Sequence, residues 1–270
     1  MQPEPFSSRP PREPMFNVPG IILASIAILV GLHLVVGNLD PRTYFDVIFG
    51  FGFVPGAWTA WLSPETVETV LRQARDAPGM AEGMGLALAQ FALVEVSSGP
   101  WSLLTYALLH GSWAHVLLNA FWLAAFGTPV ARRLGTGRFL LLCVVTALGG
   151  AFAHWLTHIY DITPMIGASG VVSGMMGAAA WFVFSSSSAG GLIDRYAHLK
   201  RRETLASMVR NRQTMVFFGI WFALNFLFGI AAAPLGLTEG GIAWQAHIGG
   251  FLAGLAVFPM MDPFSRRQPG

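Results

Sequence analysis

Residues 165–184 read MIGASGVVSGMMGAAAWFVF and contain no charged side chain. An apolar stretch of about 20 residues matches the ~30 Å hydrocarbon core of a bilayer, so this stretch predicts a membrane-spanning helix. It also carries Ser169 beside Gly170, and Ser173 one turn later. The stretch therefore raises a second question, whether either serine is a nucleophile or both are small residues at a helix packing face.

The composition of the whole chain agrees with a membrane location. Of its 270 residues, 54% are hydrophobic and only 11% are charged, with a mean hydropathy of +0.56, whereas soluble domains carry roughly 25% charged residues. A net charge of +2 is too small for a nucleic-acid binder, so nucleic acid is excluded as a partner. Cys143 is the only cysteine, so an intrachain disulfide is ruled out. It lies in an apolar run, which makes it a poor nucleophile. The composition predicts an all-α polytopic membrane protein.

Six apolar runs, each about as long as a bilayer crossing, follow one another along the chain. They cover Pro19 to Gly37, Trp113 to Val130, Phe139 to His158, Gly167 to Ser185, Met215 to Ala233 and Ile242 to Met261. We expect a six-transmembrane-helix domain over residues 19–261, after a disordered Pro-rich tail at 1–18 and before a C-terminal tail at 262–270. The first run lacks a small-residue cleavage site after it, so we expect an anchored helix.

The placement of lysine and arginine predicts the orientation of these helices. Six crossings put both termini on one side, and that side holds 13 of the 16 basic residues, six of them in the loop 186–213. Basic residues collect in cytoplasmic segments. We therefore expect both termini and the loop 186–213 in the cytoplasm, and the protein in a cell membrane such as the bacterial inner membrane.

The long segment 38–111 on the opposite side is expected to lie partly in the membrane interface without crossing. Its apolar stretch MAEGMGLALAQFALVEV is bounded by Glu82 and Glu95, which leave 12 uncharged residues between them, too few for a span. The sequence SPETVETVLRQARD predicts an amphipathic helix starting at Ser63 or Pro64. Indole rings prefer the interface, and the segment contains Trp58, Trp61 and Trp101.

Polar residues within the expected helices converge on one depth. Helices two, four and six run from the outside inwards, so residues near their N-terminal ends share the outer side of the membrane. Such polar residues are costly in lipid unless they face the bundle interior, where they indicate function. They are His115, Asn119, Ser169 and His247.

Ser169 is the candidate nucleophile. It lies at a helix start, where free backbone N–H groups and the positive end of the helix dipole stabilise an oxyanion. Gly167 and Gly170 leave room beside it for an extended substrate backbone. Ser173 lacks that opening, and we interpret it as a packing residue. Packing is also the alternative for Ser169, because membrane serines commonly bond to their own helix backbone.

His247 is the candidate general base. No Asp or Glu lies on the helix of His247 or on that of Ser169, so the pattern predicts a Ser-His dyad without an acidic third residue. The alternative role for His247 is structural, with its ring hydrogen-bonded to a backbone carbonyl. The two helices can approach each other closely only if small residues line their facing sides. Glycines supply them at 167, 170, 174 and 177 on one helix and at 250 and 254 on the other.

His115 and Asn119 are the candidate oxyanion-hole donors. They are four residues apart, hence on one helix face, and both side chains donate hydrogen bonds. The alternative is that they hold neighbouring helices together through hydrogen bonds. His33 in the first helix is interpreted as an incidental packed residue.

Taken together, these residues resemble the rhomboid intramembrane serine proteases. The resemblance covers residues 51–55 and 101–261 and includes the motifs HGSWAHVLLN, FGTPVARRLG, GASGVVSGMMGA and AHIGGFLAG. It implies Ser169 as nucleophile, His247 as base, and His115, Asn119 and the Ser169 backbone N–H as oxyanion hole. It also implies a supporting role for His110, no cofactor, and single-pass transmembrane substrates that are cut near the outer membrane face.

Two positions depart from the family pattern. Ser102 follows Trp101 where an arginine is frequent, and Ser173 stands where an aromatic residue is frequent. The resemblance also implies lateral substrate entry near helix five. An aromatic stripe there is a weak candidate for a gate, because such stripes are more often lipid-facing packing. It comprises Phe218, Phe222 and Phe226, with Trp221 alongside.

Three alternatives remain. His154 and His158 have metal-ligand spacing, which would suit a metal-dependent membrane enzyme, but the stretch HWLTH lacks the glutamate of HExxH. A rhomboid relative that binds transmembrane helices without cutting them usually lacks the serine or the histidine, and both are present here. A channel or transporter would need an intramembrane charged residue, which the six runs do not offer.

Overall fold

The computed structural model describes residues 18–77, 81, 83–96, 98–185, 196–231 and 242–266. Across these residues the chain is mostly helical and forms no strand, apart from one isolated antiparallel bridge between Phe53 and Met165. Three expectations lie outside the described residues: the disordered tail up to residue 17, the first part of the loop 186–213, and the last four residues.

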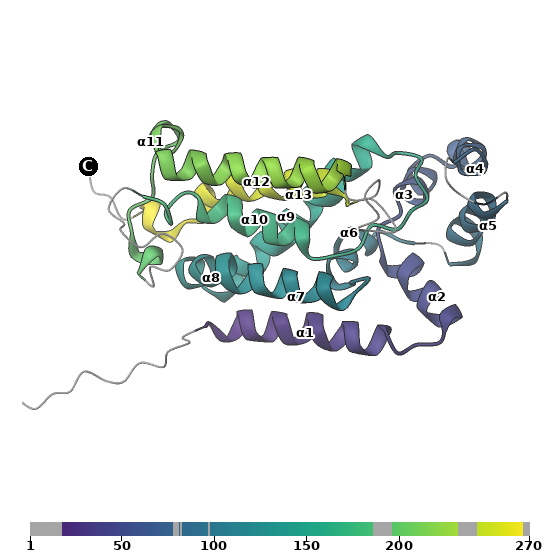
Figure 1. Ribbon diagram of the computed structural model, residues 1–270, viewed down its shortest axis with the longest axis horizontal. Coiled ribbons are helices and arrows are strands. Elements are labelled where there is room, and N and C mark those ends of the chain that lie inside the picture. The colour runs from purple at the N-terminus through teal and green to yellow at the C-terminus, as the bar shows by residue number, and fades with distance from the viewer. Residues whose placement is uncertain are drawn as a thin grey trace, which may run out of the picture.

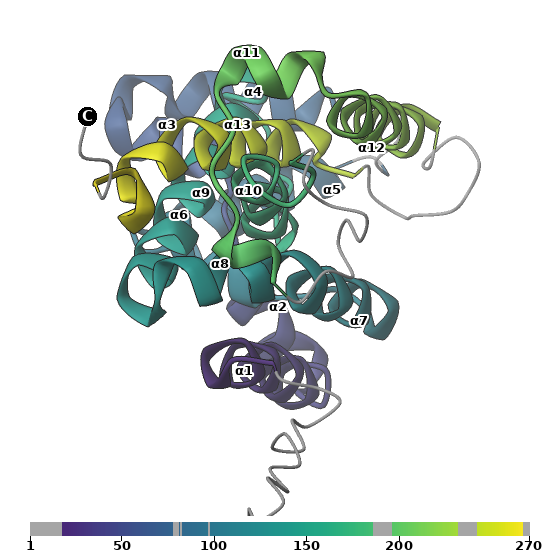
Figure 2. The ribbon, with the colours of Figure 1, turned by 90° about the vertical axis from the view of Figure 1, so that its left-hand side faces the viewer.

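The longer helices lie side by side along the long axis of the molecule (Figure 1). Viewed from the end, α10 is at the centre, with α13, α9, α7 and α8 around it and with α1 and α12 at the periphery (Figure 2). These helices are α1 (Gly20–Val36), α7 (Trp113–Trp122), α8 (Thr128–Leu134), α9 (Thr136–Thr157), α10 (Ser169–Ala179), α12 (Arg212–Ala231) and α13 (Trp244–Met261).

A five-residue π turn, η4 (Leu123–Gly127), joins α7 to α8. The resulting helix Trp113–Leu134 and α9 are both long and apolar enough, by length and composition, to cross a membrane, while α1 is a shorter apolar helix. Each of the six apolar runs therefore contains a bundle helix, although their boundaries differ from those expected.

The central helix α10 is much shorter than the expected run from Gly167 to Ser185. It ends at Ala179, and the chain continues through buried turns as far as Phe184. The indole Nε1 of Trp181 donates a 2.8 Å hydrogen bond to the Leu255 carbonyl of α13. Because neighbouring helices enclose this segment, backbone polar groups that leave the helical pattern still find protein partners.

The aromatic helix α12 begins at Arg212, three residues before the expected Met215. Asn211 accounts for the early start, because its side-chain oxygen accepts hydrogen bonds from the backbone N–H of Gln213 at 3.0 Å and of Thr214 at 3.4 Å. An asparagine at this position satisfies N–H groups that have no partner within the helix.

Short helices from the segment 38–111 gather at one end of the bundle, called here the cap end; the other, where α1 begins and α13 ends, is the tail end (Figure 1). The stretch SPETVETVLRQARD does contain an amphipathic helix, α4, which buries Val70 and Ala74, but α4 begins at Val67 after the 3-10 turn η1 and not at Ser63 or Pro64. The apolar helix Met84–Glu95 is shorter than a crossing. The short elements of this segment are α2 (Pro41–Phe51), α3 (Pro55–Leu62), η1 (Pro64–Thr66), α4 (Val67–Arg75), α5 (Met84–Gln90), η2 (Phe91–Glu95), α6 (Ser102–Thr105) and η3 (Tyr106–Leu108). Three further short elements lie outside it: η6 (Ala197–Leu199), α11 (Leu205–Arg210) and η7 (Pro263–Arg266).

Glycines let α13 pack directly on the backbone of α10. A Cβ added to Gly250 would lie 2.0 Å from the Gly170 carbonyl oxygen, and one added to Gly254 would lie 2.0 Å from the Gly174 carbonyl oxygen. Real side chains do not approach that closely, so the two helices reach this separation only with glycine at both positions. This approach brings the N-terminal part of α13 close to the start of α10.

At the tail end, Arg133 and Asp262 form a buried ion pair. The guanidinium donates to both carboxylate oxygens, at 3.0 and 2.8 Å, and neither side chain is exposed to solvent. Arg133 also donates to the carbonyls of His198 and Lys200 and lies over the Phe182 ring. The domain therefore extends past its expected end at residue 261, because Asp262 is part of its core.

Candidate active site

The structure brings the two main candidate residues into hydrogen-bond contact. Ser169 is the first residue of α10, and His247 is in the first turn of α13. The Ser169 Oγ lies 2.7 Å from His247 Nε2. A serine hydroxyl at this distance from an imidazole nitrogen has a base in position to accept its proton.

Three backbone contacts hold the chain just before Ser169. Met165 pairs with Phe53 through two backbone hydrogen bonds of 2.8 and 3.0 Å. The Gly167 N–H donates to the Tyr106 carbonyl at 2.9 Å, and the Ala168 N–H donates to His110 Nε2 at 3.4 Å. Residues from the segment before α7 thus determine where α10 begins and where the Ser169 hydroxyl lies.

Gly167 has no side chain where the candidate groups meet. Its φ of +122° lies in a region that favours glycine. A Cβ at this position would lie 2.6 Å from His115 Nε2 and 3.8 Å from Ser169 Oγ. His115 and Ser169 therefore border the same small space, in which the first-turn N–H groups of α10 have no acceptor within the helix.

Asn119, one turn after His115 on α7, is 5% exposed. Within the described part of the chain, its amide Nδ2 donates to no acceptor. Buried amide donors are almost always paired, and an unpaired one calls for an explanation. An acceptor that is present only when a substrate is bound would supply that explanation.

His110 and His33 support this region. The His110 ring packs edge-on against His115, with centroids 4.9 Å apart, and its carbonyl oxygen lies 3.0 Å from His33 Nδ1. His33 is buried and packs edge-on against Trp113 at 4.7 Å. His33 is thus a packed residue, as interpreted, and its packing also connects α1 to the segment that holds the start of α10.

Asn225 on α12 is a site residue that the sequence analysis missed. Its Oδ1 lies 2.6 Å from His247 Nδ1, on the side of the ring opposite Ser169. A search for an acidic third residue overlooked it because asparagine carries no charge. The available signal was a single amide in the apolar stretch FFGIWFALNFLFGIA, since polar residues in membrane helices face the interior.

Comparison with known proteins agrees with this geometry. The family model described as the rhomboid domain matches residues 97–262, which include every candidate residue of the site. The chain belongs to the rhomboid family.

Among its rhomboid relatives, the protease GlpG of Pectobacterium atrosepticum is 30% identical over 171 residues, which cover 63% of this chain and 51% of the relative. GlpG of Serratia proteamaculans is 30% identical over 156 residues, covering 57% and 46%. The rhomboid protease GluP of Bacillus subtilis is 37% identical over 86 residues, covering 32% and 16%. The chain thus spans about half the length, or less, of these relatives.

The two departures from the rhomboid pattern occupy buried positions. Ser102 is 1% exposed, and the preceding Trp101 donates from its indole Nε1 to the Gly50 carbonyl of α2 at 2.8 Å. Ser173 is 4% exposed inside α10, in line with its interpretation as a packing residue.

The aromatic stripe of α12 packs against the rest of the rhomboid bundle. Phe218 and Phe222 pack against the Phe251 ring of α13, with centroids 5.2 and 5.8 Å apart. Phe226 is 46% exposed and packs against Trp244 at 4.9 Å. The stripe is therefore the surface through which α12 contacts α13.

His154 and His158, the residues behind the metal-enzyme alternative, stack on each other with ring centroids 4.4 Å apart. Among the residues that the structure describes, no third His, Cys, Asp or Glu joins them to make a ligand group. Structural zinc sites use four protein ligands and catalytic sites three. The pair does not reach either number.

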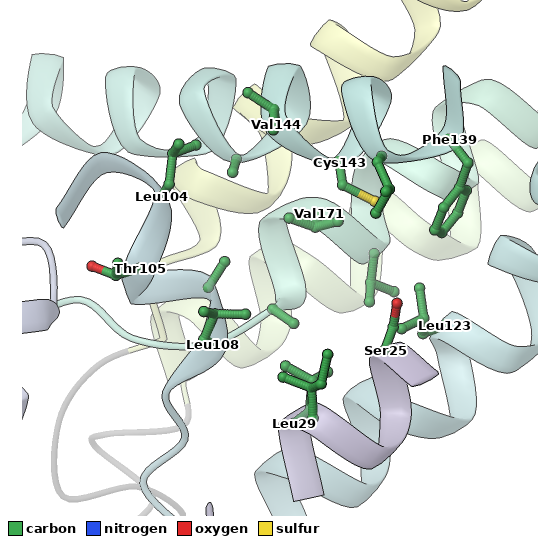
Figure 3. A pocket seen from close by; sticks show the side chains of 16 residues that line it. Ser25, Leu29, Leu104, Thr105, Leu108, Leu123, Phe139, Cys143, Val144 and Val171 are labelled. Atoms are coloured by element: carbon green, nitrogen blue, oxygen red, sulfur yellow. The ribbon is translucent and has the colours of Figure 1, made fainter. Parts of the chain in front are cut away.

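An apolar cavity of about 320 Å³ lies between α1, α9, α10 and the segment α6–η3 (Figure 3). Its lining residues include Ser25, Thr105 and Cys143, but neither Ser169 nor His247. The cavity is therefore separate from the candidate active site.

Gly167 provides a test of the shared space at the rhomboid site. We expect Gly167→Ala to lower cleavage by about 100-fold, because a methyl group would displace the His115 ring and strain the backbone before Ser169. Cleavage by the purified variant measures the effect. Gly137→Ala is the matched control, since nothing lies within 4 Å of its added Cβ. Equal activity of the two variants would contradict this account.

Proposed function

We propose that this rhomboid is an intramembrane serine endopeptidase that cuts transmembrane proteins by a Ser169–His247 dyad. The observation that carries the proposal is the 2.7 Å contact between Ser169 Oγ and His247 Nε2 at the start of α10. Asn119 on the neighbouring helix α7 adds a donor for an oxyanion, since its buried Nδ2 has no hydrogen-bond partner among the residues that the structure describes. The relatives that are named rhomboid proteases support the same activity.

In the first half of the proposed reaction, Ser169 Oγ bonds to the scissile carbonyl carbon while its proton moves to His247 Nε2. The carbonyl oxygen becomes an oxyanion, which the side chains of His115 and Asn119 and the Ser169 backbone N–H stabilise. The C–N bond then breaks, and the leaving amine takes the proton from His247. The product is an acyl-enzyme at Ser169.

In the second half, the oxygen of a water molecule bonds to the acyl carbon while His247 Nε2 takes a proton from that water. A second oxyanion forms in the same hole. It collapses to release the new carboxyl terminus, and the proton returns from His247 to Ser169 Oγ. The cycle restores the starting enzyme without a cofactor.

We further propose the topology that places this chemistry. The six bundle segments each cross the membrane, with both termini in the cytoplasm, because 13 of 16 basic residues lie on that side. The tail end then faces the cytoplasm, and the start of α10 lies toward the outer face. This arrangement suits a bacterial inner membrane and cleavage near the outer boundary.

The proposed substrates are single-pass transmembrane proteins. Such a helix has to expose an extended backbone to Ser169, because an intact helix keeps its carbonyl groups hydrogen-bonded. Gly167, whose missing Cβ leaves space between His115 and Ser169, makes room for that backbone beside the nucleophile. The expectation that Gly170 also leaves such room was wrong, because Gly170 packs against Tyr106 and Ala246. Lateral entry near α12 fits its peripheral position in the bundle (Figure 2).

The experiment is cleavage of a single-pass reporter by the purified protein in detergent, combined with labelling by a serine-reactive fluorophosphonate. We expect one cut near the outer membrane boundary, a label on Ser169, and full activity in the presence of a chelator. Loss of activity with the chelator would support a metal enzyme. Reporter binding with neither cleavage nor labelling would support a non-catalytic rhomboid.

A further inference from the structure

We propose that Asn225 of α12 is a positioning residue that sets the tautomer and orientation of His247, so that the site works as a Ser169–His247–Asn225 triad. This inference rests on the proposed function. Three residues on three helices form a chain of contacts, 2.7 Å from Ser169 Oγ to His247 Nε2 and 2.6 Å from His247 Nδ1 to Asn225 Oδ1.

The orientation of the Asn225 amide is determined by its second hydrogen bond. Its Nδ2 donates at 2.8 Å to the carbonyl oxygen of Trp221, one turn earlier on α12. A carbonyl oxygen only accepts hydrogen bonds, so the NH₂ group has to face Trp221 and the Oδ1 has to face His247. The opposite orientation would place two oxygen atoms against each other.

This orientation determines the state of the imidazole. Because Asn225 Oδ1 only accepts, the His247 Nδ1 has to carry the proton and donate it. In the neutral ring, Nε2 is then an acceptor, and it faces the Ser169 hydroxyl. The contact thus selects the one neutral tautomer that removes a proton from serine.

Aromatic contacts on both sides hold Asn225 at this position. On the side toward the tail end, Trp221 stacks on Phe251, with ring centroids 4.5 Å apart. On the side toward the cap end, Phe226 packs against Trp244 at 4.9 Å. The Asn225–His247 contact is therefore the polar layer between two aromatic layers of the α12–α13 interface.

Asparagine in this role orients the base without adding a charge. A charged aspartate would also stabilise the imidazolium that forms during the reaction, whereas asparagine supplies the hydrogen bond alone. Although these helices carry no Asp or Glu, Asn225 gives His247 an orienting partner.

The test compares variants at position 225 in the full-length protein. Asn225→Leu and Asn225→Ala remove the acceptor, and we expect each to lower kcat and the rate of fluorophosphonate labelling on the order of 10- to 100-fold, with KM within about twofold of the parent value. Asn225→Asp keeps an acceptor oxygen, and we expect it to retain activity within about fivefold. Leu224→Ala, a change at a side chain that is 46% exposed on the same helix, should leave kcat unchanged.

A second readout is the tautomer itself. In ¹⁵N spectra of histidine-labelled protein, with the His247 signal assigned by its loss in His247→Ala, we expect an Nδ1–H ring in the parent and in Asn225→Asp, and mixed tautomers in Asn225→Leu. Parent-like kcat and an unchanged tautomer in Asn225→Leu would overturn the triad. Absence of cleavage and labelling in the parent protein would instead overturn the proposed function, so the two failures are distinguishable.

Discussion

Ser169→Ala is expected to reduce reporter cleavage by at least about 10³-fold and to abolish fluorophosphonate labelling. Without Oγ no acyl-enzyme forms, and in serine proteases loss of the nucleophile or of its histidine removes nearly all acceleration that depends on the pair. His247→Ala should give a loss of similar size, because the two groups act as a unit 2.7 Å apart. Initial rates in detergent, with the site of labelling found by mass spectrometry, measure both effects.

Ser173→Ala is the matched control for this prediction. Ser173 lies one turn further along the same helix, is 4% exposed, and is replaced by a residue of similar size. We expect its cleavage rate to stay within about threefold of the parent. If Ser169→Ala retained parent-like cleavage, or if Ser173→Ala lost it entirely while remaining folded, the assignment of the nucleophile would be wrong.

Arg133→Met is expected to cost about 3–5 kcal/mol in the free energy of unfolding. Much of this cost comes from the Asp262 carboxylate, which would remain buried without the guanidinium that now donates to both of its oxygens. The carbonyls of His198 and Lys200 would also lose a charged donor. Reversible unfolding in mixed detergent micelles measures the loss.

Two comparisons separate the ion pair from a general effect of charge. Arg138→Met removes the same charge from an exposed position at the start of α9 and should change stability by less than about 1 kcal/mol. The double variant Arg133→Met/Asp262→Asn removes the stranded charge and should be more stable than Arg133→Met alone. A double variant that is less stable than Arg133→Met would contradict this explanation.

The membrane class and the family followed from the sequence, and the rhomboid family assignment is confirmed. Each of the six apolar runs contains a bundle helix. Of the four polar residues singled out for their common depth, Ser169 and His247 are in contact, His115 borders the same small space as Ser169, and Asn119 follows His115 by one turn on α7. The predicted helix boundaries were less accurate. The short α10 ends in turns that are buried among other helices, and α12 starts early because of a single capping residue. Neither feature changes the hydropathy of the sequence much.

The contacts of Asn225, His33 and Arg133 could not be predicted in the same way. In a soluble protein, polar residues mark the outward face of a helix; in a membrane helix, both the lipid-facing and the buried faces are apolar, so the pattern does not say how the helix is rotated. Only the packed bundle decides that Asn225 turns toward His247 and that Arg133 meets Asp262.

The sequence by itself determined the number of apolar runs, the bias of basic residues and the common depth of Ser169 and His247, because hydrophobic length and charge act along the membrane normal. Rotation about each helix axis and the separation between helices were decided by the tertiary structure. Gly250 and Gly254, where an added Cβ would lie only 2.0 Å from carbonyl oxygens of α10, let α13 pack onto α10, and that approach puts Ser169 and His247 in contact.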